Sequence, residues 1–418
     1  MECLNHFNRL LQDRFGIKLY DYQTHVIKEV LKYVQDGHRF IVVSMPTGSG
    51  KTLIEIFFSY WALKDKRLNT LVLEPTRFLC DQMYSKLWSK IFEEKVNKEY
   101  NGDLTKLRPI LIITPQTACK FVDQLNDSNY DVVIIDEVHH AFGSKYYSTL
   151  LRELKPKFIL GFTALLPSHK RYRIPLEIVN SIGEPIILMY DFKKIEHIDP
   201  SFKPPKAIAD LFDAEMNEIE EKTYDVLFRG LVNGDYRIIK FLELTLVHYG
   251  KRAFLESFKR AYDKGKIMDH ECFRELENSK DFSHKVRTLL NVLSIYGISE
   301  ELTPILIFTS RKATAYEMKE GILKRFRIPY DRIEVLTSDM SKDERLQLIK
   351  RAKSGEVDII ISTLVGEEGV DIPEAGLLIM SDVPKSPLRF YQRLGRLIRI
   401  VSPKRIKYLV ITLTPKTI

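Results

Sequence analysis

The segment Met45–Thr52, with the sequence MPTGSGKT, contains residue types whose spacing suits the binding of phosphate groups. Glycines let the backbone curl so that several N–H groups point at phosphate oxygens, and a helix that begins there presents its N-terminus to the same anion. In this arrangement Lys51 would reach the outer phosphates of a nucleoside triphosphate, and the hydroxyl of Thr52 would bind Mg²⁺. We therefore assign these residues to nucleotide binding: Thr47, Gly48, Ser49, Gly50, Lys51 and Thr52.

The alternative for this segment is a glycine-rich turn with an accidental lysine. The general pattern GxxxxGK[ST] is broken at its first position, where Met45 replaces glycine. The GxGKT core is intact, however, and it lies between the apolar run Phe40–Ser44 and a helical pattern from Thr52 to Leu63. This strand–loop–helix context favours the phosphate-binding interpretation.

A second chemical group follows another apolar run, Val132–Ile135, and has the sequence Asp136-Glu137-Val138-His139-His140. A carboxylate at the end of a buried strand can hold the Mg²⁺ shell, so Asp136 is predicted as a metal ligand. The adjacent Glu137 is placed to orient or deprotonate an attacking water. Taken alone, the segment is more typical of a charged turn capping a strand, but its combination with the phosphate loop favours the catalytic interpretation.

Strands and helices alternate around both groups, and the strand-like runs are apolar throughout. Runs of this kind, separated by helices, indicate a parallel sheet covered on both faces. We predict such an α/β domain over residues 1–190. Its expected strands include Phe40–Ser44, Leu71–Leu73, Ile110–Ile113, Val132–Ile135 and Phe158–Leu160.

The pattern changes after about residue 190. No strong strand run appears from Pro205 to about residue 282, and charged stretches with helical spacing fill this part. We predict a helical insertion over 191–282 and a second parallel-sheet domain over 283–418. The strands expected there are Ile305–Phe308, Ile333–Leu336, Ile359–Ser362, Leu377–Met380 and Tyr408–Ile411.

Composition agrees with a folded chain that has an anionic partner. The 418 residues carry a formal net charge of +8, with a pI near 9.0, which favours polyanions such as nucleic acid. The four cysteines lie far apart, so neither a zinc site nor a disulfide framework is predicted. No apolar run is long enough to cross a bilayer, and the first residues do not form a signal peptide. We expect an intracellular protein, in the cytoplasm of a prokaryote or the nucleus of a eukaryote.

The order of these motifs resembles the DExH branch of the superfamily-2 helicases, along nearly the whole chain from about residue 17 to 412. Within that superfamily the sequence VGEEGVDIP at 365–373, the insertion, and Ser283-His284-Lys285-Val286 look most like the archaeal Hef and Fanconi-anaemia M helicase group. The RIG-I-like and Dicer helicases are the next neighbours. The further matching motifs are Tyr22-Gln23, Glu74-Pro75-Thr76-Arg77, Thr114-Pro115-Gln116-Thr117, Gly161-Phe162-Thr163-Ala164, Ile307–Arg311, Val365–Pro373 and Gln392–Arg399.

The resemblance implies two RecA-like lobes that hydrolyse ATP with Mg²⁺ between them. It gives Gln23 an adenine contact, Asp371 a ribose contact, and Gln392, Arg396 and Arg399 catalytic roles beside Lys51 and Glu137. His139 and Thr163 would couple hydrolysis to movement. Residues expected to contact a nucleic-acid backbone without reading sequence are Thr76, Arg77, Thr114, Gln116, Ser310, Arg311 and Thr363. Each of these could equally serve to cap a loop.

Two departures from the family pattern concern motifs III and VI. Residues 163–167 read TALLP where relatives usually have TASP or TATP, which could alter coupling, and Ile398 stands where glycine is usual. In the insertion, Lys251-Arg252 and Lys259-Arg260 alternate with Phe254, Phe258 and Tyr262. This pattern favours an amphipathic helix with a solvated basic face over a DNA-gripping thumb.

Three functions remain open at this stage. The leading one is a DNA-stimulated ATPase that remodels forked or branched DNA in repair, with a nuclease or repair protein as a further partner. The second is a duplex-RNA-activated ATPase of the RIG-I-like type. The third is an inactive nucleic-acid-binding scaffold, which the intact Lys51, Asp136 and Glu137 disfavour. A metabolic kinase is disfavoured by the motifs of the second α/β domain.

Overall fold

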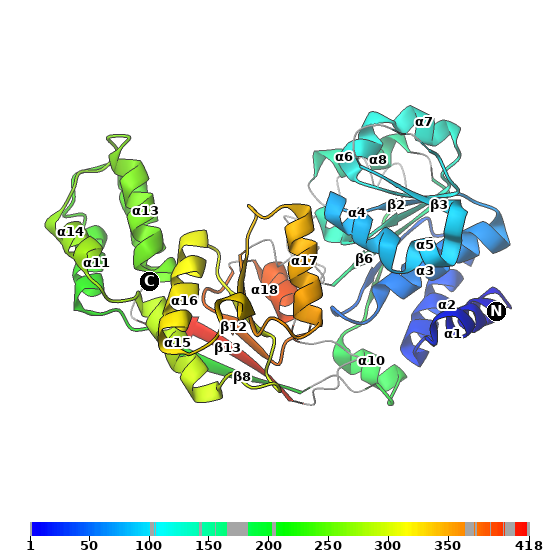
Figure 1. The fold of residues 1–418 in the computed structure, drawn as a ribbon. Helices are drawn as coiled ribbons and strands as arrows, with labels where there is room; N and C mark the ends of the chain where they lie inside the picture. The colour runs from blue at the N-terminus through cyan, green and yellow to red at the C-terminus, as the bar shows by residue number, and fades with distance from the viewer. Residues whose placement is uncertain are drawn as a thin grey trace. The chain divides into compact units, whose positions relative to one another are not determined.

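The computed structural model describes residues 2–100, 104, 106–141, 144–154, 156–164, 183–202, 206–363, 372, 374–384, 386–395, 397 and 406–415. The chain divides into two compact units, residues 1–204 and 205–418. Each unit is built around one parallel sheet flanked by helices (Figure 1). The predicted fold class, two parallel α/β sheets with helices between them in the sequence, is confirmed.

The first sheet has seven strands in the order β3-β4-β2-β5-β6-β1-β7, and all of its pairs are parallel. This order places the strand before the carboxylate pair, β5, beside β2 and β6. The strands are β1 (Phe40–Ser44), β2 (Thr70–Leu73), β3 (Val96–Glu99), β4 (Ile110–Ile113), β5 (Val132–Ile135), β6 (Phe158–Thr163) and β7 (Ile186–Met189).

Helices cover both faces of this sheet because its inner strands are apolar on both sides. One face packs against α6, α7 and α8 in a continuous core of buried side chains that includes Val133, Ile135 and Leu150. On the other side α4 and α5 lie in front of the strands in Figure 1. The helices of this unit are α1 (Glu2–Phe15), α2 (Asp21–Gln35), α3 (Lys51–Trp61), α4 (Arg77–Met83), α5 (Ser89–Phe92), α6 (Pro115–Lys120), α7 (Val122–Asp127), α8 (Lys145–Glu153) and α10 (Phe192–Ile198).

The second sheet has six parallel strands in the order β10-β11-β9-β12-β13-β8. Its core packs against α15 and α16 through residues such as Val286, Leu289 and Met318. The strands are β8 (Lys206–Asp213), β9 (Ile305–Phe308), β10 (Ile333–Leu336), β11 (Ile359–Ser362), β12 (Leu377–Met380) and β13 (Ile406–Leu413). The other helices here are α15 (His284–Tyr296), α16 (Lys312–Arg325), α17 (Lys342–Lys353) and α18 (Pro387–Leu394).

Strand β8 corrects the prediction that no strand lies between residue 205 and residue 282. It pairs along its whole length with β13 at the edge of the second sheet. An edge strand has one unpaired side, and Ile208 and Leu211 are exposed here, so the sequence lacks the apolar run of an inner strand. Its charged residues, Lys206, Asp210 and Asp213, are spaced by four and three positions, which is the spacing of one face of a helix.

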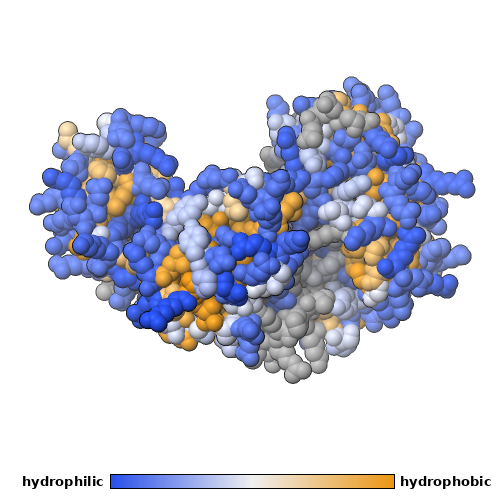
Figure 2. Space-filling view, in the orientation of Figure 1, coloured by the Kyte–Doolittle hydropathy of each residue, from blue (hydrophilic) through white to orange (hydrophobic). Residues whose placement is uncertain are grey.

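The helical insertion has a hydrophobic core of its own, formed by α11 (Glu218–Phe228), α12 (Tyr236–Tyr249), α13 (Lys251–Tyr262) and α14 (Glu271–Asn278). Phe254 is fully buried in this core, and Phe258 packs against it. The apolar face of α13 thus packs inward, as the amphipathic interpretation predicted. Figure 2 shows that hydrophilic residues cover most of the visible face of each unit.

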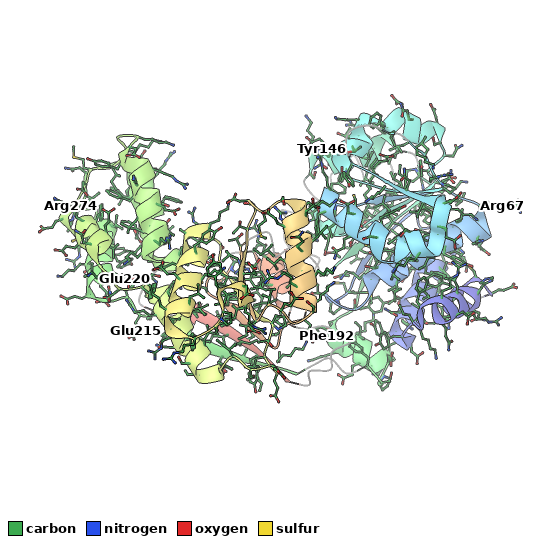
Figure 3. All side chains as sticks on the ribbon, viewed as in Figure 1. Arg67, Tyr146, Phe192, Glu215, Glu220 and Arg274 are labelled. Carbon is green, nitrogen blue, oxygen red and sulfur yellow. The ribbon has the colours of Figure 1, made fainter. Side chains whose placement is uncertain are left out.

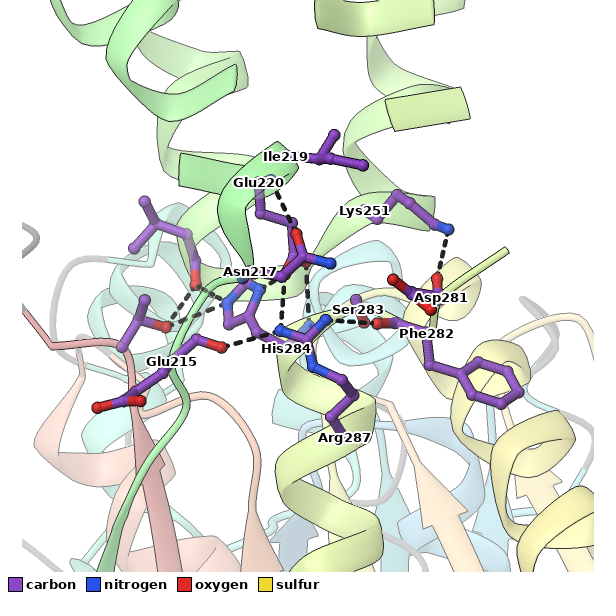
Figure 4. A network of polar contacts seen from close by, with 12 residues as sticks. Glu215, Asn217, Ile219, Glu220, Lys251, Asp281, Phe282, Ser283, His284 and Arg287 are labelled. Carbon is purple, nitrogen blue, oxygen red and sulfur yellow. Dashed lines mark hydrogen bonds and ion pairs between the residues drawn. The ribbon is translucent and has the colours of Figure 1, made fainter. Parts of the chain in front are cut away.

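A buried polar network joins the insertion to the second sheet, and Glu220 is its centre (Figures 3 and 4). Glu220 completes a capping box with Asn217 at the start of α11, at 2.9 and 3.1 Å. Its carboxylate also accepts hydrogen bonds from the backbone N–H and Nδ1 of His284, both at 3.0 Å, and from Arg287, also at 3.0 Å. His284 Nε2 lies 3.1 Å from the carbonyl oxygen of Val247. Helices α11, α12 and α15 therefore meet at one charged cluster.

None of the helices in the described part of the chain is both long and apolar enough to span a membrane.

We predict that Glu220→Gln lowers the free energy of unfolding by about 3–5 kcal/mol near neutral pH, because it removes the charge of a buried pair. Burial acts to raise the pKa of Glu220, but the hydrogen bonds and charge of His284 together with the backbone N–H of Asn217 outweigh burial and lower the pKa. The stability from this carboxylate is thus present above the pKa of the unfolded state and is lost as the pH falls through the folded-state pKa. Urea unfolding at neutral and acidic pH should show the difference between variant and wild type shrinking in acid.

Glu218→Gln is the matched control, since the Glu218 side chain on the same helix is 83% exposed. It should change stability by less than about 0.5 kcal/mol. A deficit for Glu220→Gln that stays the same in acid would contradict the proposed role of the charge.

Candidate active site

The phosphate loop connects β1 to α3, as the sequence predicted. Gly48 and Gly50 have φ values of +81° and +73°, a left-handed conformation that favours glycine. The first N–H groups of α3, which begins at Lys51, have no partner within the helix and are suited to an anion. The two glycines thus allow a curled loop directly before the N-terminus of α3.

Within the loop, Lys51 and Ser49 are buried. The Lys51 Nζ donates to the carbonyl oxygens of Met45 and Pro46, at 3.2 and 3.4 Å, so the lysine lies along the loop. The Ser49 hydroxyl has no hydrogen-bond partner among the described residues. Thr52 follows directly and is partly exposed. Thr47 and Gly48, at the tip of the loop, are also accessible.

Gln23 lies behind this loop and is fully buried. Its Nε2 donates to the carbonyl oxygen of Ser49 at 3.0 Å, and its Oε1 accepts from the N–H of Tyr20 at 2.9 Å. A Cβ at Gly50 would lie 2.4 Å from Gln23 Nε2, so Gly50 also permits this close approach. Gln23 therefore positions the loop, and its adenine contact stays a prediction.

The carboxylate pair follows β5 at the carboxyl edge of the sheet. Glu137 has φ +46°, which is uncommon for a residue other than glycine and typical of constrained functional turns. Its N–H donates to Asp136 Oδ1 at 2.8 Å. Asp136 Oδ1 thus accepts a hydrogen bond from the turn, whereas Glu137 Oε2 lies 3.3 Å from His139 Nδ1.

His139 joins the carboxylate pair to the end of β6. Its Nδ1 lies 2.9 Å from the Thr163 hydroxyl and 3.3 Å from Glu137 Oε2, and the ring is buried. The structure thus brings together Glu137, His139 and Thr163, which the sequence placed in two separate motifs. Their role in coupling stays a prediction, and residues 165–167 of the altered motif lie outside the described residues.

The surroundings of Asp136 and Glu137 shift the pKa values of their carboxyl groups in opposite directions. Burial, reinforced by the charge of Glu137, raises the pKa of Asp136 to about 6. Burial also acts to raise the pKa of Glu137, but the His139 hydrogen bond and the charge of Lys51 outweigh it and lower that pKa to about 2. Glu137 is therefore ionised at any physiological pH.

Glu55 and Glu74 are two further carboxyl groups at this site that the sequence analysis did not identify as site residues. Both are fully buried, and their carboxyl oxygens have no hydrogen-bond partner among the described residues. Burial first, and the charge of Asp136 second, raise both pKa values well above the ordinary range, which favours the neutral form of each acid. The sequence signal for Glu55 was a glutamate within an otherwise apolar helix face, one turn after Lys51, whereas Glu74 stood in the motif Glu74–Arg77 without an assigned role.

The residues of the first unit predicted to contact nucleic acid follow β2 and β4, which are adjacent strands. The Thr76 hydroxyl accepts from the N–H of Leu79 at 3.2 Å and caps α4, and the Thr114 hydroxyl lies 3.0 Å from that of Thr117. Arg77 and Gln116 are exposed. Both threonines therefore act as caps, while the two longer side chains are accessible to a ligand.

In the second unit, Ser310 and Thr363 follow the adjacent strands β9 and β11. The Ser310 N–H and hydroxyl donate to Asp382 at 2.5 and 2.9 Å, and the buried Arg393 binds the same carboxylate at 3.1 Å. The Thr363 hydroxyl donates to the carbonyl oxygen of Leu336 at 3.3 Å. The Ser310 and Thr363 donors are thus engaged within the protein. Arg311 is partly exposed beside them.

Of the predicted catalytic residues in this unit, Gln392 is buried near the end of α18. Asp371, Arg396, Arg399 and Ile398 lie outside the described residues, as does most of the segment 365–373.

Two family descriptions match the chain. "Type III restriction enzyme, res subunit" matches residues 16–168, and "Helicase conserved C-terminal domain" matches residues 284–401. The chain is a superfamily-2 helicase. Its enzymatic class, a helicase ATPase, follows from the same matches and agrees with the phosphate loop and the carboxylate pair described above.

Relatives of this helicase include archaeal proteins. It is 28% identical over 398 residues to "DNA 3'-5' translocase XPB2" of Sulfurisphaera tokodaii, covering 93% of this chain and 80% of that protein. It is 26% identical over 425 residues to "Putative ATP-dependent RNA helicase MJ1505" of Methanocaldococcus jannaschii, covering 85% of this chain and 54% of that protein. The helicase therefore spans most of the first relative and about half of the second.

The similarity to the Hef and Fanconi-anaemia M group is also confirmed. The helicase domain of Hef from Pyrococcus furiosus matches with a TM-score of 0.59 and 19% identity, covering 97% of each chain, which shows a shared fold. A segment of 102 residues, 22% of this chain and 5% of the relative, is 37% identical to "Fanconi anemia group M protein" of Gallus gallus.

The oxygen donors of the helicase fit Mg²⁺. Thr52 and Asp136 offer a hydroxyl and a carboxylate, and Mg²⁺ is usually held by one or two such groups together with phosphates and water. No group of three histidine, cysteine or carboxylate side chains in the described residues is arranged to hold a metal by itself. The site therefore fits a metal that arrives with a nucleotide.

We predict that Thr163→Val leaves nucleotide affinity unchanged but slows ATP hydrolysis, because His139 loses the hydroxyl that orients it. The loss should also reduce stability by about 1–3 kcal/mol, since the buried His139 Nδ1 loses the nearer of its two partners. Titration with a fluorescent ATP analogue, steady-state hydrolysis and thermal unfolding measure the three effects.

Thr70→Val is the matched control, because Thr70 is a buried strand residue whose hydroxyl has no partner among the described residues. It should leave hydrolysis unchanged. Wild-type hydrolysis by Thr163→Val would contradict a role for this contact.

Proposed function

We propose that the helicase is an ATP-driven DNA translocase that remodels forked or branched DNA. The observation that carries this proposal is the chain of contacts from Glu137 through His139 to Thr163, together with the charge of the loop residue Lys51 acting on Glu137. Through these contacts, a change at Glu137 during hydrolysis can move Thr163 at the end of β6. A protein that only binds nucleotide does not need such a connection. The name of the XPB2 relative, a DNA 3'-5' translocase, supports DNA as the track.

In the proposed mechanism, Lys51 and the loop N–H groups bind the phosphates, and Thr52 and Asp136 hold Mg²⁺. The metal neutralises charge on the phosphates when bound. Glu137, ionised at physiological pH, orients the attacking water. Gln23 would contact adenine and Asp371 the ribose, as in the family.

The second unit would complete the site. Arg396 and Arg399 would stabilise the charge of the transition state, with Gln392 sensing the outer phosphate, so hydrolysis requires the two lobes to close. Nucleic acid that favours the closed state then stimulates hydrolysis. Thr76, Arg77, Thr114, Gln116, Ser310, Arg311 and Thr363 mark the proposed track, of which Arg77, Gln116 and Arg311 have the most accessible side chains.

A duplex-RNA-activated ATPase is the second candidate, and the name of the MJ1505 relative favours it. This candidate has the same fold and the same ATP chemistry as the first. The two candidates differ in the nucleic acid that stimulates hydrolysis. A repair role and a nuclease partner belong to the first candidate alone.

Steady-state ATP hydrolysis tests these candidates with no nucleic acid, single-stranded DNA, forked DNA, a four-way junction and duplex RNA. We predict stimulation chiefly by forked or junction DNA. Arg399→Ala should lower the stimulated rate by about 10³–10⁵-fold, as loss of an arginine finger does. Arg327→Ala, which changes an exposed arginine elsewhere in the second unit, should have no effect.

Stimulation chiefly by duplex RNA would reject the DNA-remodelling proposal in favour of the second candidate. No hydrolysis above a Lys51→Ala background with any nucleic acid would reject both.

A further inference from the structure

Arg311 lies between the second sheet and the helical insertion, where its guanidinium group contacts two aromatic rings. It follows β9 immediately before α16, and its guanidinium carbon lies 5.4 and 5.2 Å from the ring centres of Phe241 and Tyr249 on α12. Among the described residues, no hydrogen bond or ion pair uses the guanidinium. Arginine has five N–H donors, so the two rings hold a cation whose donors remain available.

Phe241 is 44% exposed, although it belongs to a helix with a well-packed apolar face. The core of the insertion takes Ile239, Leu242 and Leu246 from α12 and leaves Phe241 out. Its ring therefore contributes little to the insertion core and presents an open aromatic face beside Arg311.

A second cation, Lys285, lies in the same region. It is 3% exposed in the first turn of α15, and no hydrogen bond or ion pair to it exists among the described residues. Its Cγ lies 3.8 Å from where a Cβ of Gly250 would be, directly after Tyr249. Burial lowers the pKa of Lys285 to about 8, and the charge of Asp382 acts against this shift.

Asp382 does not balance these charges, because it already forms an ion pair with Arg393 at 3.1 Å. The charge of Asp382 is thus shared between Arg393 and Lys285, and Arg311 adds a further positive charge with no carboxylate paired to it among the described residues. A positive region with an open aromatic face suits a single nucleic-acid strand, because phosphates take the charge and every base has a face that can stack.

We propose that Phe241 and Arg311 form a nucleotide-stacking platform, on which one base of the bound strand stacks against Phe241 while the adjoining phosphate binds Arg311. Lys285 adds positive charge behind the platform. The inference rests on the proposed function and specifies where the strand contacts the insertion. Recognition of this kind is independent of sequence and requires a base as well as a phosphate.

Fluorescence anisotropy with a labelled single-stranded oligonucleotide tests the platform. Phe241→Ala and Phe241→Leu should both weaken binding by about 5- to 150-fold, the range for loss of one stacked base. Arg311→Met should weaken binding and reduce the slope of log affinity against log salt by about 0.7, the value for one phosphate contact on a single strand. Phe228→Ala is the matched control: Phe228 is 47% exposed and has Lys240 Nζ 5.6 Å from its ring centre, and its loss should change nothing.

An oligonucleotide with a run of abasic sites separates stacking from charge. Wild type should bind it as weakly as Phe241→Ala binds the normal strand, and Phe241→Ala should lose nothing further. If wild type binds both strands equally, or if Phe241→Ala, Arg311→Met and Phe228→Ala all retain wild-type affinity and salt slope, the platform is refuted and the motor proposal stands. Wild type that binds no strand of either kind would overturn both proposals.

Discussion

Four buried carboxyl groups lie together at the carboxyl edge of the first sheet: Glu55, Glu74, Asp136 and Glu137. A buried carboxyl group must either stay protonated or have a partner for its charge, and the rest of the site depends on how this constraint is met. Burial raises the pKa of Glu55 and of Glu74 and so favours their neutral forms, whereas Lys51 and His139 lower the pKa of Glu137 and favour its ionised form. Asp136 lies between these extremes, with a pKa near 6. A buried charge needs a partner, and here the partners are the loop lysine and the histidine that reaches Thr163. The same contacts that stabilise the carboxylates therefore connect the phosphate loop to the neighbouring strand.

In the second unit a different buried charge has a comparable role. Glu220 joins the start of α11 to the start of α15, which fixes the insertion against the sheet. The next residues along α15 include Lys285, and α12 supplies the rings that hold Arg311. The proposed contacts with a nucleic-acid strand thus depend on the insertion and sheet being held together. Flexible attachment of the insertion would leave Arg311 without its aromatic support.

The inner strands and the phosphate loop could be predicted from the sequence because continuous apolar runs and a fixed glycine–lysine spacing are compatible with few local structures. The edge strands β3 and β8 could not, since they contain polar residues such as those of Val96–Glu99. The edge strand β7 (Ile186–Met189) is apolar but was not predicted. No site role was predicted for Glu55 or Glu74 because their raised pKa values arise from three-dimensional burial. The hydroxyls of Ser310 and Thr363 fit the motif pattern, but their bonds to Asp382 and Leu336 depend on tertiary packing.

The central claim is that Glu137, held by His139, activates water for ATP hydrolysis. Single-turnover hydrolysis by wild type and Glu137→Gln, with saturating nucleic acid and nucleotide affinity measured in parallel, tests it most directly. The account predicts that Glu137→Gln binds nucleotide normally and hydrolyses it about 10²–10⁴-fold more slowly, the usual contribution of a general base. Hydrolysis at the wild-type rate by a variant that binds nucleotide normally would contradict the account.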